Sequence, residues 1–124
     1  MSDVVQGVVV CHGDLAAALV GAVAHIAGAP EALVAVTNAE CDREALRQRI
    51  ASAVGDAPTI IFTDLPNGSC VMAALSELRH GHDARIVTGV NLAMLLDFVF
   101  HRDGDLDTTA ARLATVGATA ITVP

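Results

Sequence analysis

The stretch Gly7–Leu19, GVVVCHGDLAAAL, carries the signals that decide the fold. Its continuous apolar run from Gly7 to Cys11 is typical of a strand buried on both faces of a sheet. Asp14 can cap the helix that is expected over Leu15 to Ala27. His12 stands between the strand and the helix, where an ordinary turn needs a glycine and a cap but no imidazole. The histidine therefore points to a function at this turn.

The same alternation of apolar strand and amphipathic helix continues along the whole chain. Further strands are expected at 33–36, 59–63, 84–87 and 119–123, and further helices at about 42–54, 70–79, 91–101 and 107–116. Asn91 and Asp107 are the expected caps of the last two helices, and Gly117 is expected to end the last one. This order predicts an α/β fold, a doubly wound, mainly parallel five-stranded sheet with helices on both faces. Because no linker or repeat interrupts it, we expect residues 1–124 to form one domain.

The composition of the 124 residues limits the function classes. Hydrophobic residues make up 53% of the chain and aromatic residues only 2%, so the core consists mainly of Ala, Val, Leu and Ile and offers little surface for stacking bases. The formal net charge is −7, with only 7 Lys and Arg residues. Nucleic-acid binding depends on neutralising phosphates with basic side chains. The sequence therefore predicts a protein that does not bind nucleic acid.

Hydropathy and cysteine content bear on where the protein works. Mean hydropathy is +0.56, but the most apolar stretch, Leu15–Ala29, is shorter than the roughly 20 residues of a spanning helix. The start of the chain, Met1–Asp3, lacks the positive flank of a signal peptide. The 3 cysteines form no CxxC pair, which suits reduced thiols. We expect a cytoplasmic protein.

Three of the expected strands are followed by polar residues. The first strand leads into His12–Asp14, the third into Asp64 and the turn 66–69, and the fourth into 88–91. In open parallel sheets, ligands and reacting groups gather at the carboxyl ends of the strands. If these strands are neighbours, His12 and Asp64 share one edge of the sheet.

The residue types at this edge indicate a particular chemistry. A neutral imidazole such as His12 has a free lone pair, and a carboxylate such as Asp64 can fix its tautomer and stabilise the cation that forms on attack. Helix N-termini favour anions, and Gly13, Gly68 and Ser69 allow the backbone to approach a phosphate closely. The pattern predicts a nucleophilic histidine that accepts a phosphoryl group, without a cofactor and without a metal.

Other interpretations of these residues remain open at this stage. Asp64 is equally compatible with a turn or a helix cap, and 67–69 with an ordinary turn followed by an N-cap. Ser69, His12 and Asp64 contain the residues of a hydrolase triad, but no G-x-S-x-G motif surrounds the serine. The cysteines and His12 match no zinc-ligand spacing, and the segment 80–83, HGHD, resembles a surface metal site that lacks further ligands.

Three segments in register resemble a known family: GVVVCHGDLAAALVGAVAHIAG (7–28), IIFTDLPNGSC (60–70) and IVTGVNLAMLLDFVFHR (86–102). They resemble the enzyme IIA component of the mannose family of the bacterial sugar phosphotransferase system. The resemblance implies a phosphotransferase in which His12 takes a phosphoryl group from HPr and passes it to a IIB component of a sugar permease. It also implies that Asp64 supports the histidine and that Gly68 and Ser69 lie beside the phosphate.

The resemblance has further implications and some departures. It implies a homodimer in which the last strand, 119–123, is antiparallel and crosses to the partner subunit. The family turn commonly has two glycines followed by Ser-Pro, whereas here Asn67 stands for the first glycine and Cys70 for the proline. Two alternatives to sugar transport remain open for the same chemistry: a regulatory switch that reports phosphorylation state, and a phosphate donor to a dihydroxyacetone kinase.

Overall fold

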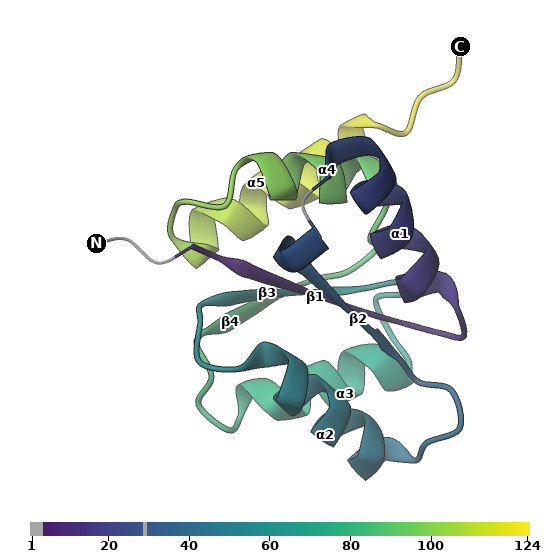
Figure 1. The fold of residues 1–124 in the computed structure, drawn as a ribbon, viewed down its shortest axis with the longest axis vertical. Coiled ribbons are helices and arrows are strands. Elements are labelled where there is room, and N and C mark those ends of the chain that lie inside the picture. Colours follow the sequence, from purple (N-terminus) through teal and green to yellow (C-terminus); the bar gives the residue numbers. More distant parts are fainter. Residues whose placement is uncertain (1–3, 29) are drawn as a thin grey trace.

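A parallel sheet forms the centre of the computed structural model, which describes residues 4–28 and 30–124 (Figure 1). The sheet has four strands in the order β2-β1-β3-β4. Their bounds are Gln6–Cys11 for β1, Leu33–Thr37 for β2, Thr59–Thr63 for β3 and Ala84–Val87 for β4. All three pairings are parallel, so the carboxyl ends of the strands meet at one edge. The predicted parallel α/β fold is confirmed.

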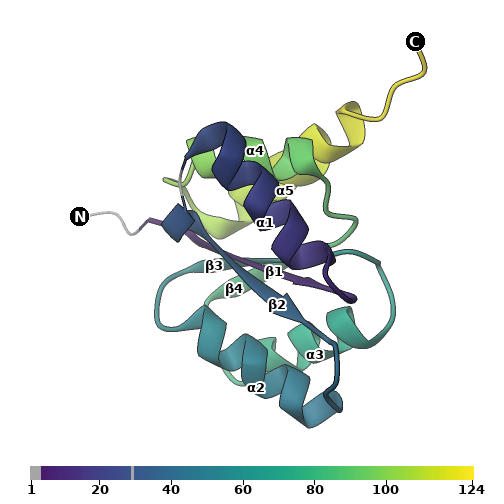
Figure 2. The ribbon, with the colours of Figure 1, turned by 45° about the vertical axis from the view of Figure 1, so that its right-hand side comes forward.

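Helices cover both faces of this sheet, as Figures 1 and 2 show. One face carries α1 (Leu15–Ala27), α4 (Leu92–Phe100) and α5 (Leu106–Thr119), and the other carries α2 (Arg43–Val54) and α3 (Ser69–Leu78). A short 3-10 turn, Pro30–Ala32, precedes β2. Among the helices of the described residues, none is both long and apolar enough to cross a bilayer.

The strand β1 is buried on both of its faces, as its apolar sequence predicts. Val9 and Cys11 belong to the core beneath α1, α4 and α5, whereas Val8 and Val10 belong to the core beneath α2 and α3. All four side chains are fully buried. Two separate hydrophobic cores therefore hold β1 in the middle of the sheet, and its carboxyl end is fixed in place.

The helix caps agree with the sequence at some ends and not at others. Gly28 ends α1 in the left-handed conformation, with φ of 67°, and Asn91 caps α4 by accepting a hydrogen bond from the Met94 amide. Asp14 occupies the N-cap position of α1 as predicted, but its side chain makes no capping hydrogen bond. The carboxylate that caps α5 comes from Asp105, two residues before the predicted one, through the Thr108 amide at 2.8 Å.

The predicted fifth strand is wrong, because α5 extends to Thr119 and residues 120–124 form no strand. The amides of Ala120 and Ile121 still donate to carbonyls of the helix, at 3.2 Å each. Ile121 is 78% exposed and Val123 is 97% exposed. A strand is stabilised only by pairing with another strand, and within the described residues the segment 120–124 has none. The sheet of the described chain has four strands, and none of its strand pairings is antiparallel.

Gly117 does not end α5, as the sequence suggested, but lies inside the helix. A Cβ atom at this position would lie only 2.6 Å from the Cε atom of Met94. The carbonyl of Gly117 also accepts a hydrogen bond from the side chain of Asn91 at 3.0 Å. The glycine therefore serves the close packing of α5 against α4.

Candidate active site

The imidazole of His12 and the carboxylate of Asp64 meet at the carboxyl edge of the sheet. Because β1 and β3 are parallel neighbours, with Val10 opposite Thr63, the residues that follow them emerge side by side. The Nδ1 atom of His12 lies 2.8 Å from Oδ2 of Asp64, and the His12 amide donates to the same oxygen at 2.9 Å. The predicted shared edge is confirmed for this pair.

This pairing decides which nitrogen of the ring is free. A carboxylate accepts hydrogen bonds, so the proton lies on Nδ1 and the lone pair lies on Nε2. Among the residues the structure describes, none forms a hydrogen bond with Nε2. The side chain of His12 is 45% exposed, whereas that of Asp64 is only 11% exposed. The geometry presents a nucleophilic nitrogen to the outside and keeps its carboxylate partner inside.

The carboxylate of Asp64 is held in its charged form. Partial burial tends to raise the pKa of Asp64, but the hydrogen bonds from the His12 amide and imidazole, with the charge of the ring, together lower that pKa below its ordinary value. The amide of Leu65 adds a hydrogen bond to Oδ1 at 3.0 Å. A charged carboxylate beside Nδ1 stabilises the cation that forms when Nε2 attacks an electrophile.

The three other predicted site residues lie in the loops around this pair. Gly13 and Gly68 adopt positive φ angles of 57° and 101°, which favour glycine. The Gly13 amide donates to Oδ1 of Asn38 at 3.2 Å, and the amide group of Asn38 donates to Oγ of Ser69 at 3.4 Å. Asn38 therefore links the loop after β1 to the start of α3. Ser69 is the first residue of that helix, beside Gly68 at its N-cap.

Asn38 and its neighbour Thr37 are site residues that the sequence analysis missed. The hydroxyl of Thr37 donates to the carbonyl of Gly13 at 2.7 Å and so fixes the turn that carries His12. A signal for both was present, because they directly follow the second expected strand as His12 follows the first. The rule that polar residues at strand ends mark a site applies to β2 as well.

Cys70 is a third residue whose position at the site was missed. Its Sγ atom lies 3.8 Å from Nδ1 of His12, although only 1% of the residue is exposed. Burial, with the charge of Asp64 as a second cause, raises the pKa of this thiol to about 11. Burial raises the pKa of Cys11 further, to about 12, with smaller contributions from Asp64 and Cys70. Both thiols are therefore protonated at neutral pH.

The structure does not assemble the other constellations considered from sequence. The partner of the Ser69 hydroxyl is Asn38, and in the described residues no hydrogen bond joins Ser69 to His12, as a hydrolase triad requires. In the segment 80–83, Nδ1 of His80 donates to the carbonyl of Ser76 at 2.9 Å. The Nε2 atom of His82 is paired with Glu77 at 2.7 Å. These histidines serve helix α3 and its end.

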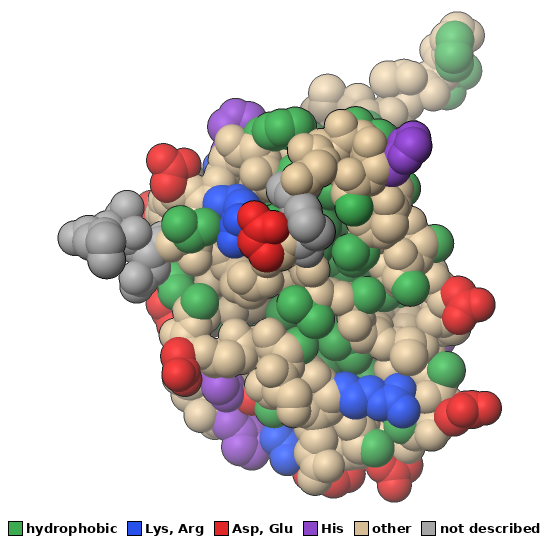
Figure 3. Space-filling view, viewed as in Figure 1, with side chains coloured by type: hydrophobic (Ala, Val, Ile, Leu, Met, Phe, Trp, Pro, Cys, Tyr) green, Lys and Arg blue, Asp and Glu red, His purple; other side chains and the backbone are tan. Residues whose placement is uncertain are grey.

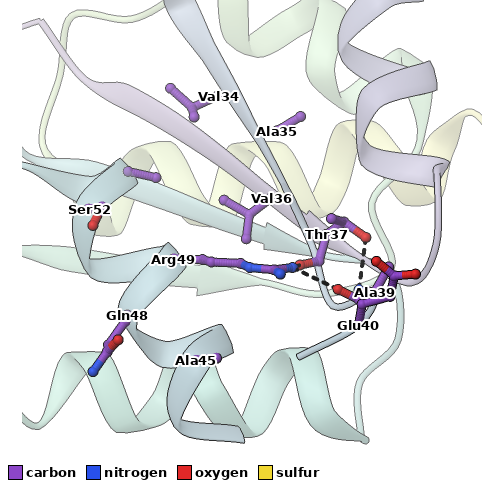
Figure 4. A pocket seen from close by; sticks show the side chains of 11 residues that line it. Val34, Ala35, Val36, Thr37, Ala39, Glu40, Ala45, Gln48, Arg49 and Ser52 are labelled. Carbon is purple, nitrogen blue, oxygen red and sulfur yellow. Dashed lines mark hydrogen bonds between the residues drawn. The ribbon is translucent and has the colours of Figure 1, made fainter. Parts of the chain in front are cut away.

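A groove of about 880 Å³ lies elsewhere, between the exposed edge of β2 and helix α2 (Figure 4). Figure 3 shows hydrophobic side chains gathered at the sheet edge between α1 and α2. Among the described residues that line the groove, the one cation is Arg49, whose guanidinium donates to the carbonyls of Thr37 at 2.7 Å and Ala39 at 3.0 Å. Neither His12 nor Asp64 lines this groove, so the candidate active site lies outside it.

A comparison with protein families matches residues 6–116 to the family described as PTS system fructose IIA component, EIIA-man. The chain belongs to this family. The family suggested by the three sequence segments is thereby confirmed, and the protein is a IIA component of the phosphotransferase-system type. The comparison with curated proteins found no match.

Solved structures share the fold over nearly the whole length of the chain. A mannose/sorbose specific IIA subunit from Enterococcus faecalis is 26% identical with a TM-score of 0.86, covering 100% of this chain and 96% of its own. The phosphotransferase system component EIIA from Streptococcus agalactiae is 23% identical with a TM-score of 0.86, covering 96% of both chains. A sigma-54 interaction domain protein from Enterococcus faecalis shares the fold at 11% identity, with a TM-score of 0.77 and coverage of 97% and 95%.

Proposed function

We propose that the protein is a phosphohistidine carrier that accepts a phosphoryl group from HPr on His12 and passes it to a IIB component for sugar uptake. The observation that carries this proposal is the 2.8 Å contact between Nδ1 of His12 and Asp64, which leaves Nε2 free at the surface. Membership of the IIA family supports the same function. The protein is in this sense a phosphotransferase.

The geometry supports Nε2 as the atom that carries phosphate. Its lone pair attacks the phosphorus of the phosphohistidine of HPr; the new N–P bond forms as the donor's N–P bond breaks, and the donor histidine keeps the electron pair. The Nδ1 proton stays in its hydrogen bond to Asp64, whose charge balances the positive charge on the ring. Transfer to IIB reverses these steps with the acceptor as nucleophile. His12 is the catalytic nucleophile, and Asp64 is the residue that orients and stabilises it.

Backbone and hydroxyl groups near His12 suit a phosphoryl anion. Helix α3 begins beside the ring, because its second residue, Cys70, lies 3.8 Å from Nδ1. The first amides of a helix have no partner within the helix and attract anions. The Ser69 hydroxyl accepts a hydrogen bond from Asn38, so its own proton is free to be donated. We assign phosphate binding to this turn, with Gly13, Gly68 and Ser69.

The surroundings of the site also suit docking of partner proteins. Leu15 begins α1 three residues after His12, Leu65 follows Asp64, and Met72 lies in the first turn of α3; all three side chains are exposed. Exposed apolar side chains around a functional group are typical of a protein–protein contact. HPr and the IIB component are the proposed partners at this surface, in the cytoplasm.

The proposal is tested by phosphorylation with labelled phosphoenolpyruvate, enzyme I and HPr. Wild-type protein should take up one phosphoryl group in acid-labile form, and His12→Ala should take up none. His25→Ala is the matched control, because this histidine is exposed on α1 and should leave labelling unchanged. Labelling of His12→Ala, or none of the wild type, would overturn the proposal. Loss of the label on addition of a IIB component then tests the acceptor.

We also propose a homodimer. The exposed apolar side chains of Ile121 and Val123 in the segment after α5 support it, because burying them against a second copy removes apolar surface from water. Analytical ultracentrifugation should find a dimer, and deletion of residues 120–124 should convert it to a monomer. A monomeric full-length protein would contradict this part of the proposal.

A further inference from the structure

Three side chains of different chemistry converge at the candidate site. They are His12 after β1, Asp64 after β3, and Cys70 in the first turn of α3. One potential metal-binding atom from each lies within 4.8 Å of the other two. The imidazole Nδ1 is the common neighbour, 2.8 Å from Oδ2 of Asp64 and 3.8 Å from Sγ of Cys70. Phosphoryl transfer uses the first two of these residues and gives the thiol no role.

These separations fit one face of a tetrahedral metal site. Zinc binds nitrogen and carboxylate oxygen at about 2.0–2.2 Å and sulfur at about 2.3 Å, so tetrahedral ligand atoms lie about 3.3–3.6 Å apart. The observed separations of 2.8 Å and 3.8 Å bracket that range. To bind a cation, the Nδ1–Oδ2 contact lengthens by about 0.6 Å and the Nδ1–Sγ contact shortens by about 0.2 Å, while the third pair, Asp64 and Cys70, starts within 4.8 Å. Because His12 is 45% exposed, the site is open to solvent on one side.

The charge balance of the three groups also suits a divalent cation. A coordinated thiol loses its proton even where burial keeps it protonated without the metal. One divalent cation, the carboxylate of Asp64 and the thiolate of Cys70 then sum to zero charge. Sulfur and imidazole ligands together favour zinc and similar thiophilic metals over magnesium or calcium.

We propose that His12, Asp64 and Cys70 form a site for a thiophilic divalent cation of the zinc class, and that this cation and a phosphoryl group on His12 exclude one another. In binding, Nδ1 donates its lone pair to the metal, so the ring proton moves to Nε2. Cys70 releases one proton to solvent, and water takes the fourth position. A protonated Nε2 has no lone pair with which to attack phosphorus. The binding stands by itself, whereas the exclusion rests on the proposed phosphocarrier function.

The other two cysteines are placed differently. Cys11 points into the core on the opposite face of the sheet, beneath α1, whereas Cys70 belongs to the core beneath α2 and α3. Cys41 donates its thiol hydrogen to the carbonyl of Asn38 at 3.3 Å and is not in the group of converging ligand atoms found in the described residues. Cys41→Ser is therefore the matched control for a change at Cys70.

The first experiment measures binding without any phosphotransferase component. Zinc is titrated into the reduced full-length protein against a chromogenic chelator, and cobalt(II) is used as a spectroscopic probe. Wild type and Cys41→Ser should bind one metal per chain and show a thiolate-to-cobalt charge-transfer band. Cys70→Ser and Cys70→Ala should lose the band and bind zinc at least about a hundredfold more weakly. Even removal of a residue that only hydrogen-bonds to a metal ligand lowers metal affinity about 10–100-fold.

Circular dichroism checks that each variant is folded. If one of the two Cys70 variants does not fold, the other still provides the test. Wild-type protein that binds no zinc, or unchanged binding in a folded Cys70 variant, would overturn the assignment. Equal weakening by Cys41→Ser would also overturn it, because the thiol ligand would then be misassigned.

The second experiment measures labelling of His12 from HPr, with and without zinc. For each protein, the labelling rate with zinc is divided by the rate without zinc. This ratio should be about 0.1 or less for wild type and near one for Cys70→Ala. The Cys70 variant also controls for effects of zinc on enzyme I and HPr. A wild-type ratio near one under saturating zinc would overturn the exclusion. Absence of labelling without zinc would instead contradict the phosphocarrier function and leave the binding result standing.

Discussion

Two histidine–carboxylate pairs in this molecule have nearly the same contact distance and different surroundings. Nδ1 of His12 lies 2.8 Å from Asp64, and Nε2 of His82 lies 2.7 Å from Glu77. The carboxylate of Glu77 also binds the guanidinium of Arg47 at 3.2 Å, so a permanent cation balances its charge in a buried position between α3 and α2. In the described residues, the one basic side chain that contacts Asp64 is His12, which carries a charge only when its ring gains a proton or a phosphoryl group.

The difference explains why we propose a reactive site at the first pair and not at the second. In the described residues no permanent cation contacts Asp64, so its negative charge stabilises the cation that forms on His12 in the proposed reaction. Glu77 has the permanent charge of Arg47 beside it, which it shares with Glu44, and this contact holds α3 against α2. Position adds to this, because His12 follows a strand at the edge where helix N-termini lie, whereas Glu77 is inside a helix. Contact distance alone does not separate the two roles.

The largest expected difference between the two pairs is in phosphoryl transfer. Asp64→Asn should lower the rate of labelling of His12 by about 10³-fold, because an amide no longer fixes the tautomer or stabilises the charged ring. Glu77→Gln, the same change in the other pair, should leave the rate within about twofold. Labelling kinetics from phosphorylated HPr measure both. A normal rate in a folded Asp64→Asn would remove the carboxylate from the mechanism.

Thiol reactivity sharpens the description of the surroundings of the first pair. Because burial and the charge of Asp64 raise the pKa of Cys70 from 9.0 to about 11, its thiolate fraction at neutral pH is about a hundredfold lower. In the native protein, Cys41 should react with dithionitrobenzoate at least about a hundredfold faster than Cys70. The fast phase should vanish in Cys41→Ser and persist in Cys70→Ser. A fast phase that depends on Cys70 would contradict this arrangement.

Stability, unlike phosphoryl transfer, should depend strongly on the pair formed by His82 and Glu77. Glu77→Gln should lower the free energy of unfolding by about 1.5–3 kcal/mol, the range for a buried hydrogen bond to a charged group. Glu44→Gln is the matched control, because Glu44 binds the same Arg47 but is exposed, and its effect should be much smaller. Urea unfolding followed by circular dichroism measures both. Equal effects of the two changes would show that burial does not determine how much Glu77 contributes to the free energy of unfolding.

The smallest expected effect is a pH dependence of stability from the first pair. The pKa of Asp64 is lowered in the folded protein, so its contribution is fully present above the unfolded carboxyl pKa of about 3.9 and is lost as the pH falls through the lower folded value. The free energy of unfolding of wild type, measured relative to Asp64→Asn, should therefore decrease from pH 6 to pH 3. A difference that grows toward acid would contradict the lowered pKa.

Much of the fold follows from local pattern. The run Gly7–Cys11 predicted a strand buried on both faces, and both of its faces are packed. The segment 119–123 has a similar β-branched pattern but is not a strand, because pairing depends on a second strand being in place. Asp14 lies at the N-cap of α1 without a side-chain bond for a related reason, since the chain geometry at the turn after β1 decides whether a side chain can reach the first amides.

The site was predictable in part. That His12 and Asp64 share an edge followed from parallel strands, once β1 and β3 were assumed to be neighbours. The positions of Asn38 and Cys70 beside them did not follow, because those contacts depend on how the loop after β2 and the start of α3 are packed. Contacts between residues that are far apart in the sequence leave no periodic pattern in it.

The sequence by itself determined the order of strands and helices, the polar residues at the strand ends and the family, because hydrophobic periodicity and short motifs are local properties. The tertiary structure alone decided that the sheet has four strands. It also decided which ring nitrogen of His12 is free and placed a thiol beside the ring. These depend on distances between segments, set by packing of the two cores around β1. The same packing places one histidine–carboxylate pair at the open sheet edge, where we propose phosphoryl transfer, and the carboxylate of the other between α3 and α2.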